Sequence, residues 1–492
     1  MSEQQDSYRS IMKATSLFGG VQVFNIIISI IRSKVVAVLL GPFGMGIMGL
    51  LNATIGIISS LTNFGLGMSA VKDIATAHST GDHVRISTVV SVFRRLVWVT
   101  GVLGLLLTLL LSPWLSELTF GNNSYTIAFV WISLSLLFSQ LSSGQLVILQ
   151  GMRKLKLLAK ANVLGSTLGL FVTLPLYYYY GIEGIVPGII GTAFITFLIS
   201  WIYARKVHIK PITITFSQTI GEGKSMLQMG FMISLSGLLT VGASYIVKIF
   251  ISRTGSIADV GLYTAGFAII NTYVGLIFNA MGTDYYPRLS AVSHDNKLCK
   301  QAINQQAEIA VLILAPILMV FLTFINWAII LLYSKQFLGI NGMIYWAVLG
   351  IFFKAASWSI AFIFLAKGTS KLFFINELIT NIYLLSFNLA GYYYFGLTGL
   401  GISFAIAYFI YLIQVFLISK LKFDFSFDSD FIKIFSIQFG LALGCFIVVM
   451  FIKQPYPYFI GVLLIALSSW YSFKELDKRL DLKIIFQKLR NK

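Results

Sequence analysis

Fourteen long apolar stretches, separated by short polar loops, make up most of this 492-residue chain. About 20 helical residues cross the hydrocarbon core of a bilayer, and these stretches have that length. Period-2 alternation is absent and the runs are too long for membrane strands, so helices are expected. With 57% hydrophobic and only 11% charged residues, the chain cannot cover the surface of a soluble protein of this size. We predict an all-α polytopic membrane protein. The expected spans are 17–40, 46–70, 91–112, 125–149, 161–180, 184–204, 227–251, 262–283, 307–332, 343–366, 372–395, 398–419, 431–452 and 456–473.

An internal repeat runs through the first twelve of these spans. The sequence YYYYGIEGI at 177–185 returns as YYYFGLTGL at 392–400, and the same offset links Gly46 to Gly261. Each copy has six spans, so both copies enter the membrane from the same side. We therefore expect two six-helix lobes related by a pseudo-two-fold axis along the membrane normal, as in parallel-repeat transporters. The predicted parts are an N-terminal lobe at 1–210, a C-terminal lobe at 211–422, an appended helix pair at 423–473 and a basic cytoplasmic tail at 474–492.

The distribution of Lys and Arg predicts the orientation. If the N-terminus is cytoplasmic, most of the 36 basic residues lie in inner loops and tails, and the outer loops keep only Arg253, Lys335 and Lys453. This asymmetry predicts that both termini are cytoplasmic. Basic loops beside an anionic leaflet also explain the net charge of +18 without nucleic acid. The tail 474–492 fits either an amphipathic helix on the inner leaflet or a solvated basic segment.

Four basic residues fall inside the expected spans, where an ionisable group costs about 2.5–3.5 kcal/mol and normally faces a cavity or a partner. Lys354 lies midway along 343–366, too deep for its stem to reach either interface. Its helical neighbours include Ser357, which we expect to line a water-filled cavity with it. An ion pair between Lys354 and Glu377 on the next span is the alternative, and the two interpretations are compatible.

Arg32 belongs to a polar stripe on the first span. Gln22, Asn25, Ser29 and Arg32 are spaced to share one helix face. We expect this face to line the cavity, although hydrogen bonding between helices would also explain such a stripe.

Lys34 and Lys248 lie at nearly equivalent depths in the two copies. Both are close enough to the outer interface for their ammonium groups to reach it, but their pairing in the two copies favours a functional role.

Glu377 and Asn381 form a polar stripe on the eleventh span. Asn381 is expected to line the cavity, and Glu377 is a candidate for coupling to a proton or Na⁺ because burial raises the pKa of a carboxyl group.

Motifs for catalysis are missing. The sequence contains no phosphate-binding loop, no nucleophile elbow and no cluster of metal ligands, so we expect neither an enzyme nor a cofactor or metal site. A cavity lined by fixed positive charges should hold an anion, and a phosphate group suits Lys and Arg.

Three segments carry a resemblance to a known family. They are LGIFFKAASWSIAFIFLAKGTSKLFFINELITN at 349–381, MGTDYYPRLSA at 281–291 and VAVLLGPFGMGIMG at 36–49. The chain resembles O-antigen translocases, which are lipid-linked oligosaccharide flippases of the multidrug/oligosaccharidyl-lipid/polysaccharide exporter superfamily. The resemblance covers about residues 8–420 and implies a two-lobed core with a central cationic cavity. Fourteen helices depart from the usual twelve of that subfamily and are similar in number to lipid II flippases.

The resemblance also implies a substrate and a mechanism. The pyrophosphate of an undecaprenyl-diphosphate oligosaccharide would bind Lys354, Arg32 and also Lys248 and Lys34, while its polyprenyl chain stays in the membrane lipid. Alternating access would then carry the glycan across the bacterial cytoplasmic membrane, towards polysaccharide assembly proteins. A multidrug or cation antiporter of the same superfamily is one alternative, but it should have acids and aromatic residues in its cavity, whereas basic residues dominate the spans here. A polysaccharide polymerase is another, but it should have large outer loops rich in Arg.

Overall fold

The computed structural model describes residues 3–210 and 212–480, and all the regular elements in these residues are helices. The prediction of an all-helical membrane protein is thus confirmed.

Contacts divide the chain into unit 1, Met1–Gly261, and unit 2, Leu262–Lys492. Unit 1 contains α1 (Glu3–Leu39), α2 (Gly41–Thr62), α3 (Leu66–Ser79), α4 (His83–Leu110), α5 (Ser112–Phe120), η1 (Asn123–Tyr125), α6 (Thr126–Gly151), α7 (Leu155–Tyr180), η2 (Gly181–Gly184), α8 (Ile185–Arg205), α9 (Phe216–Thr254) and the start of α10 (Ile257–Ala268). Unit 2 continues with η3 (Ile269–Val274), α11 (Gly275–Ala291), α12 (Asn296–Leu332), η4 (Lys335–Ile340), α13 (Asn341–Ala366), α14 (Ser370–Phe423), α15 (Ser429–Phe451) and α16 (Tyr456–Leu480).

Eleven segments of the described chain are long and apolar enough to cross a membrane. Two of them, Leu155–Arg205 and Lys371–Phe423, each contain two expected spans. The expected span 227–251 lies in α9, which is not one of the eleven segments, so the count of fourteen stays a prediction. The predicted tail 474–492 begins inside α16, and its residues 481–492 lie outside the described part of the chain.

The helix boundaries reproduce the sequence repeat. Adding 215 to the ends of α6, Thr126–Gly151, gives those of α13, Asn341–Ala366. The same offset links two backbone breaks, Gly181 (φ 55°, ψ −127°) after α7 and Gly396 (φ 57°, ψ −142°) within α14. Only glycine adopts such angles readily, which explains why YYYYG and YYYFG mark the point where each long segment turns back. The predicted lobe boundary at residue 210 follows the repeat, whereas α9 packs with α2, α3 and α4 of unit 1.

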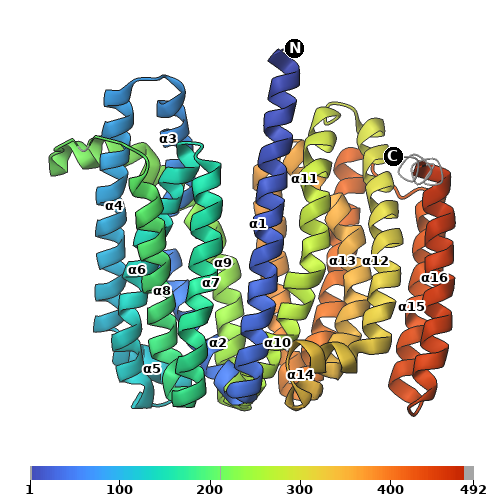
Figure 1. Ribbon diagram of the computed structural model, residues 1–492. Coiled ribbons are helices and arrows are strands. Elements are labelled where there is room, and N and C mark those ends of the chain that lie inside the picture. Colours follow the sequence, from blue (N-terminus) through green and yellow to red (C-terminus); the bar gives the residue numbers. More distant parts are fainter. Residues whose placement is uncertain (1–2, 211, 481–492) are drawn as a thin grey trace, which may run out of the picture. The chain divides into compact units, whose positions relative to one another are not determined.

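Unit 1 is a bundle in which α6 contacts both α4 and α8, and α7 lies between α8 and α1 (Figure 1). Buried apolar side chains of α3, α4 and α6, such as Ile74, Phe93 and Ile148, form its core. Asp82 begins α4 by accepting hydrogen bonds from the backbone N–H groups of Val84 and Arg85, as an N-cap residue should. The contacts among α1, α6, α7 and α8 place most of the helices that bound the cavity described below.

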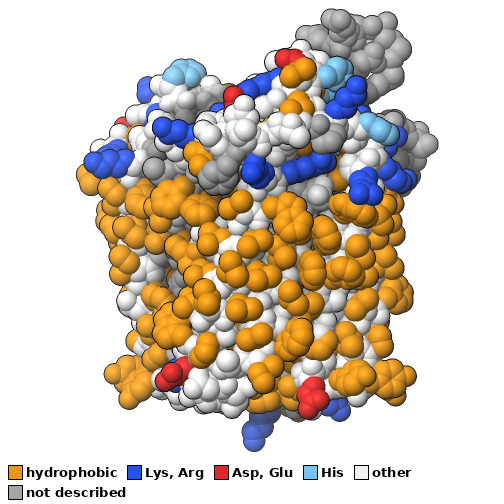
Figure 2. All heavy atoms as spheres, turned by 90° about the vertical axis from the view of Figure 1, so that its left-hand side faces the viewer, with side chains coloured by type: hydrophobic (Ala, Val, Ile, Leu, Met, Phe, Trp, Pro, Cys, Tyr) orange, Lys and Arg blue, Asp and Glu red, His pale blue; other side chains and the backbone are white. Residues whose placement is uncertain are grey.

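A belt of apolar side chains covers the face of the molecule seen in Figure 2, with most of the Lys, Arg and His side chains of that face at one end. Large apolar residues stay exposed along the helices, for example Trp98, Leu110 and Phe171. Exposed apolar side chains over such a height are expected where lipid rather than water surrounds the protein.

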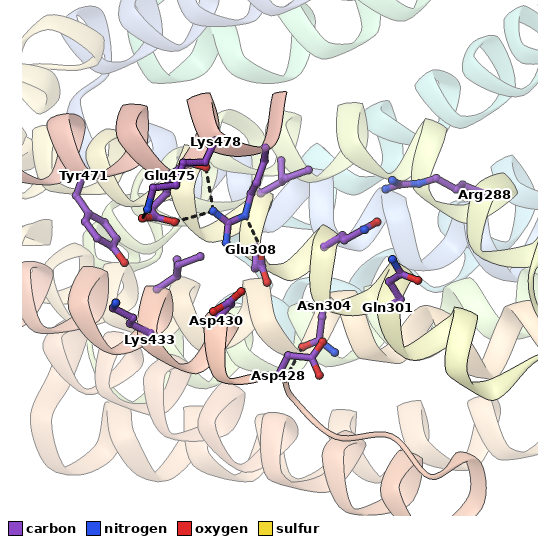
Figure 3. A pocket seen from close by; sticks show the side chains of 14 residues that line it. Arg288, Gln301, Asn304, Glu308, Asp428, Asp430, Lys433, Tyr471, Glu475 and Lys478 are labelled. Carbon is purple, nitrogen blue, oxygen red and sulfur yellow. Dashed lines mark hydrogen bonds and ion pairs between the residues drawn. The ribbon is translucent and has the colours of Figure 1, made fainter. Parts of the chain in front are cut away.

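The appended helices α15 and α16 pack on α12 of unit 2. Near one end of this contact, Arg479 donates hydrogen bonds to Glu308 on α12 and to Glu475 one turn earlier, each at 2.7 Å (Figure 3). These groups line a cavity of about 690 Å³ that contains four acidic and four basic side chains. The balance of charge makes this ionic cluster a connection between helices rather than a site for ions of one sign.

Candidate functional site

A polar cavity of about 430 Å³ lies within unit 1, bounded by α1, α2, α6, α7 and α8. Half of its sixteen lining residues carry hydroxyl groups, although apolar atoms make up most of the exposed wall, and Arg32 has the one charged side chain among the described residues that line it. The lining residues are Arg32, Met48, Asn52, Ile55, Ser135, Ser139, Ser142, Ser143, Leu146, Thr173, Tyr177, Gly188, Ile189, Thr192, Ala193 and Thr196. A cavity of this composition suits a polar ligand with negative charge.

Arg32 reaches this cavity from α1 and rests against α7. Its Nη2 donates to the backbone oxygen of Ser166 at 3.4 Å, near the limit for a hydrogen bond. Its Nε is buried and has no hydrogen-bond partner in the described structure. The hydroxyl group of Ser166 donates to Asn25 at 3.1 Å, so Asn25 and Arg32 contact the same residue of α7. Because Arg32 lines the cavity and its Nη2 makes only this one long bond among the described residues, the guanidinium end keeps donor capacity that a ligand could use.

The hydroxyl groups of the wall are held by the backbone. Thr173 donates to Leu170 at 3.0 Å, Ser135 to Ile132 at 2.7 Å and Ser142 to Thr196 at 3.3 Å, each to a carbonyl oxygen. A hydroxyl group that donates in this way still has lone pairs that can accept from another group. The wall can thus accept hydrogen bonds from a ligand while Arg32 supplies positive charge.

The other residues predicted on α1 and α9 lie at different places in unit 1. Gln22 and Ser29 are exposed, and Lys34 is half-buried. Lys248 is also half-buried, and its Nζ lies 3.5 Å from the backbone oxygen of Gly49 on α2. The structure therefore places Arg32 in the polar cavity and Lys248 against the backbone of a neighbouring helix.

Lys354 lies in the middle of α13, among aromatic rings of unit 2. Its Nζ is 5.1 Å from the ring centre of Tyr408, 5.7 Å from that of Phe278 and 5.8 Å from that of Phe404. Each distance is within the range of a cation–π interaction, which contributes about 0.5–2 kcal/mol depending on solvent. These rings offset part of the cost of placing the ammonium group at this depth. Ser357, predicted to share its face, is fully buried and donates to the carbonyl oxygen of Lys354 at 3.1 Å.

Glu377 has its own partner on α14. Tyr411 donates to the carboxylate of Glu377 at 2.8 Å, and the Asn381 amide donates to the backbone oxygen of Glu377, also at 2.8 Å. The ion pairs found among the described residues do not include the alternative pairing of Glu377 with Lys354. Tyr408 connects the two sites, since its ring lies 6.2 Å from that of Tyr411. Lys354 and Glu377 thus belong to one neighbourhood without being salt-bridged.

Sequence reasoning missed the hydroxyl groups of α6 and α8. Ser135, Ser139, Ser142 and Ser143 recur at helical spacing, so they share one face of α6, and this periodicity could have identified them. The aromatic neighbours of Lys354 gave no such signal, because they come from α11 and α14 and only folding brings them together.

Comparisons with known proteins agree with the membrane fold. A family model described as polysaccharide biosynthesis protein matches residues 35–341, more than half of the chain. The lipid III flippase of Escherichia coli (strain K12) is 20% identical over 369 residues, which are 75% of this chain and 88% of that protein.

Two solved structures share the fold at 16% identity. Lipid II flippase MurJ, in an inward closed conformation, has a TM-score of 0.67 and covers 94% of this chain and 99% of its own. An inward-facing multidrug resistance MATE family transporter of the MOP superfamily also has a TM-score of 0.67, with coverage of 82% and 94%. The predicted relation to proteins of polysaccharide biosynthesis is confirmed by the family model, and the relatives named here are flippases and transporters.

Proposed function

Because the chain belongs to the polysaccharide biosynthesis protein family, we propose that it is a flippase for a polyprenyl-diphosphate-linked oligosaccharide. It would move the lipid-linked repeat unit of an O-antigen or a related surface polysaccharide from the inner to the outer leaflet of the cytoplasmic membrane. The observation that carries this proposal is the cavity of unit 1, in which Arg32 supplies the one charge among the described lining residues and hydroxyl groups form much of the wall.

The cavity chemistry matches the two polar parts of such a substrate. A diphosphate offers several anionic oxygens, and Arg binds them with a planar fork of N–H groups. Arg32 in unit 1 and Lys354 in unit 2 each place a positive charge at membrane depth without an ion pair in the described structure. Sugar hydroxyls would exchange hydrogen bonds with groups such as Ser139 and Thr192. The polyprenyl chain would remain in the surrounding lipid throughout.

A drug or cation exporter would need the opposite polarity. Cationic substrates require carboxylates or open aromatic faces, whereas the described lining of the unit 1 cavity has no acid. In unit 2 the aromatic faces of Phe278, Phe404 and Tyr408 already surround the protein's own cation, Lys354. This arrangement favours an anionic substrate over the antiporter alternative.

The membrane potential can supply the driving force. One elementary charge moved through 100 mV is worth about 2.3 kcal/mol, so a doubly charged diphosphate leaving a negative interior gains about twice that amount. Coupling to an ion through Glu377 would add to this term. Its carboxylate accepts a hydrogen bond from Tyr411.

Lys354 provides the direct test. In cells deleted for the protein, the wild-type gene should restore export of the glycan, and Lys354→Ala should not, although the variant is inserted in the membrane at normal level. Lys354→Arg keeps the charge and serves as the matched variant; it should restore part of the export. Normal export by Lys354→Ala would exclude the assigned role of this residue.

The side on which precursors accumulate separates a flippase from a polymerase. Cells that lack a flippase should hold lipid-linked units facing the cytoplasm, out of reach of a membrane-impermeant glycosidase in intact spheroplasts. Loss of a polymerase would instead leave single units on the outer side, where the enzyme digests them. The second pattern would contradict the proposed function.

A further inference from the structure

A second cavity, of about 910 Å³, lies at another place in unit 1. Three segments form it: the turn between α3 and α4, the turn between α6 and α7, and the residues that follow α8. They lie at the end of unit 1 that the Lys and Arg distribution predicts to be cytoplasmic. Its lining residues are His78, His83, Val84, Ile86, Ser87, Met152, Lys154, Lys206, Val207, His208, Ile209, Lys210 and Ile212.

The charge of this cavity has one sign. Three lysines and three of the four histidines of the chain line it, and its described lining contains no acid. Two carboxylates of nearby segments are occupied elsewhere. Asp82 caps the N-terminus of α4, and Glu222 forms an ion pair with Arg85 at 2.6 Å. The lysines therefore lack acidic partners within the cavity, and an anion could neutralise them. Figure 2 shows basic and histidine side chains gathered at one end of unit 1.

Apolar residues complete the wall. Met152 and Val207 are buried, each with only 8% of its surface exposed, and Ile86 is buried beside them. Val84 is different, because 67% of its surface remains exposed. A cavity that combines cationic groups with an apolar wall fits an amphiphile better than a small hydrated ion. The apolar part of an amphiphile gains free energy by leaving water for such a wall, whereas a hydrated ion does not.

The repeat shows that this cluster is not a general feature of the fold. At the offset of 215, Lys154, Lys206, His208 and Lys210 correspond to Thr369, Leu421, Phe423 and Phe425 in the second copy. Basic loops on the cytoplasmic side are expected in both copies of any such protein. At these four positions the first copy has basic residues and the second has none, so the cluster exceeds what the repeat and the topology require, and this favours a ligand.

We propose that this cavity binds the phosphate headgroup of an anionic lipid in the leaflet that the charge distribution predicts to face the cytoplasm. The site goes beyond the proposed transport cavity, because its lining shares no residue with that of the Arg32 cavity. Lys154, Lys206 and Lys210 contact the phosphate oxygens, and the histidines offer further ring N–H donors. The glycerol or prenyl part of the lipid lies against the apolar wall.

The test is lipid binding by the full-length protein in a neutral detergent, measured by isothermal titration calorimetry. The probes are dihexanoyl phosphatidylglycerol, farnesyl diphosphate, dihexanoyl phosphatidylcholine and inorganic phosphate. The triple variant Lys154→Gln/Lys206→Gln/Lys210→Gln removes the lysines of the cavity. The matched control Lys156→Gln/Lys160→Gln/Lys224→Gln removes three exposed lysines from other positions of the same predicted cytoplasmic segments.

Each lysine near a lipid phosphate contributes about 1 kcal/mol, or about fivefold in affinity, so the triple variant should bind an anionic lipid about 100-fold more weakly. The control variant should stay within threefold of the wild type. Stronger binding of phosphatidylglycerol would identify an ordinary phospholipid, and stronger binding of farnesyl diphosphate a prenyl diphosphate; either supports the proposal. Equal weakening in both variants, equal binding of phosphatidylcholine, or equally tight binding of inorganic phosphate would overturn it. If the triple variant elutes as aggregate, the single variant Lys154→Gln replaces it. This variant should bind the anionic lipid about fivefold more weakly. An unchanged affinity would likewise overturn the proposal.

Discussion

Replacing Arg32 with Gln should weaken substrate binding strongly while leaving the fold intact. The reason lies in the contacts of the guanidinium group. Its bond to the carbonyl oxygen of Ser166 is long, at 3.4 Å, and its buried Nε has no partner in the described structure. A hydrogen bond at this limiting length, even from a charged donor, contributes only about 1 kcal/mol to folding. The variant should therefore unfold within a few degrees of the wild type.

The effect on the ligand should be much larger. A hydrogen bond to a charged group contributes about 1.5–3 kcal/mol, and Arg can make two such bonds to one phosphate. We expect Arg32→Gln to cost about 3 kcal/mol, or about 150-fold in affinity for a short-chain polyprenyl diphosphate. Arg32→Lys keeps the charge but loses the planar fork, so about tenfold weaker binding is expected. Calorimetry on the purified protein measures both values, and flipping in liposomes should fall in the same order.

The matched control separates ligand contact from helix packing. Ser166→Ala removes the hydroxyl group that donates to Asn25, but keeps the carbonyl oxygen that Arg32 contacts. If Arg32 served mainly to hold α1 against α7, loss of this neighbouring bond should weaken binding in a similar way. The reasoning would be refuted by two results: affinity of Arg32→Gln within threefold of the wild type, or a loss in Ser166→Ala as large as that in Arg32→Gln.

Three further predictions concern other parts of the molecule. Gly181→Ala and Gly396→Ala should each destabilise the protein by about 1–3 kcal/mol in thermal unfolding, because a side chain is strained at a positive φ. Gly221→Ala is the control and should not destabilise the protein, since Gly221 has open space at its Cβ and no positive φ. Glu308→Gln should lower the free energy of unfolding by about 3 kcal/mol, because it leaves the half-buried Arg479 without one of its two carboxylates. The double variant with Arg479→Gln should recover part of this stability, and equal losses in the single and the double variant would contradict a buried pair. Glu377→Gln should abolish any dependence of flipping on a proton or Na⁺ gradient while transport driven by membrane potential persists, and an unchanged gradient dependence would exclude ion coupling at this residue.

The sequence predicted the fold in unusual detail because lipid leaves few alternatives. Long apolar runs must be helices, and the repeated YYYYG and YYYFG segments marked the two glycines at which α7 and α14 turn. The cost of a charge in a span pointed to Arg32 and Lys354, and the structure places both among groups suited to a buried cation. The division after Gly261 could not be foreseen, because it depends on which helices α9 contacts rather than on the repeat.

The two copies also use equivalent positions differently, and here lies the strongest argument that Lys354 has a function. At the offset of 215, Lys354, Phe404 and Tyr408 correspond to Ser139, Ile189 and Ala193, all of which line the cavity of unit 1. These three residues of unit 1 are uncharged and smaller than their counterparts, whereas in unit 2 the same positions bring a lysine and two rings within 6 Å of one another. A lysine needed only for the architecture of the bundle should have a counterpart in the first copy. Because Ser139 fulfils the structural requirement there without a charge, the cost of burying Lys354 is better explained by an anion that this charge attracts.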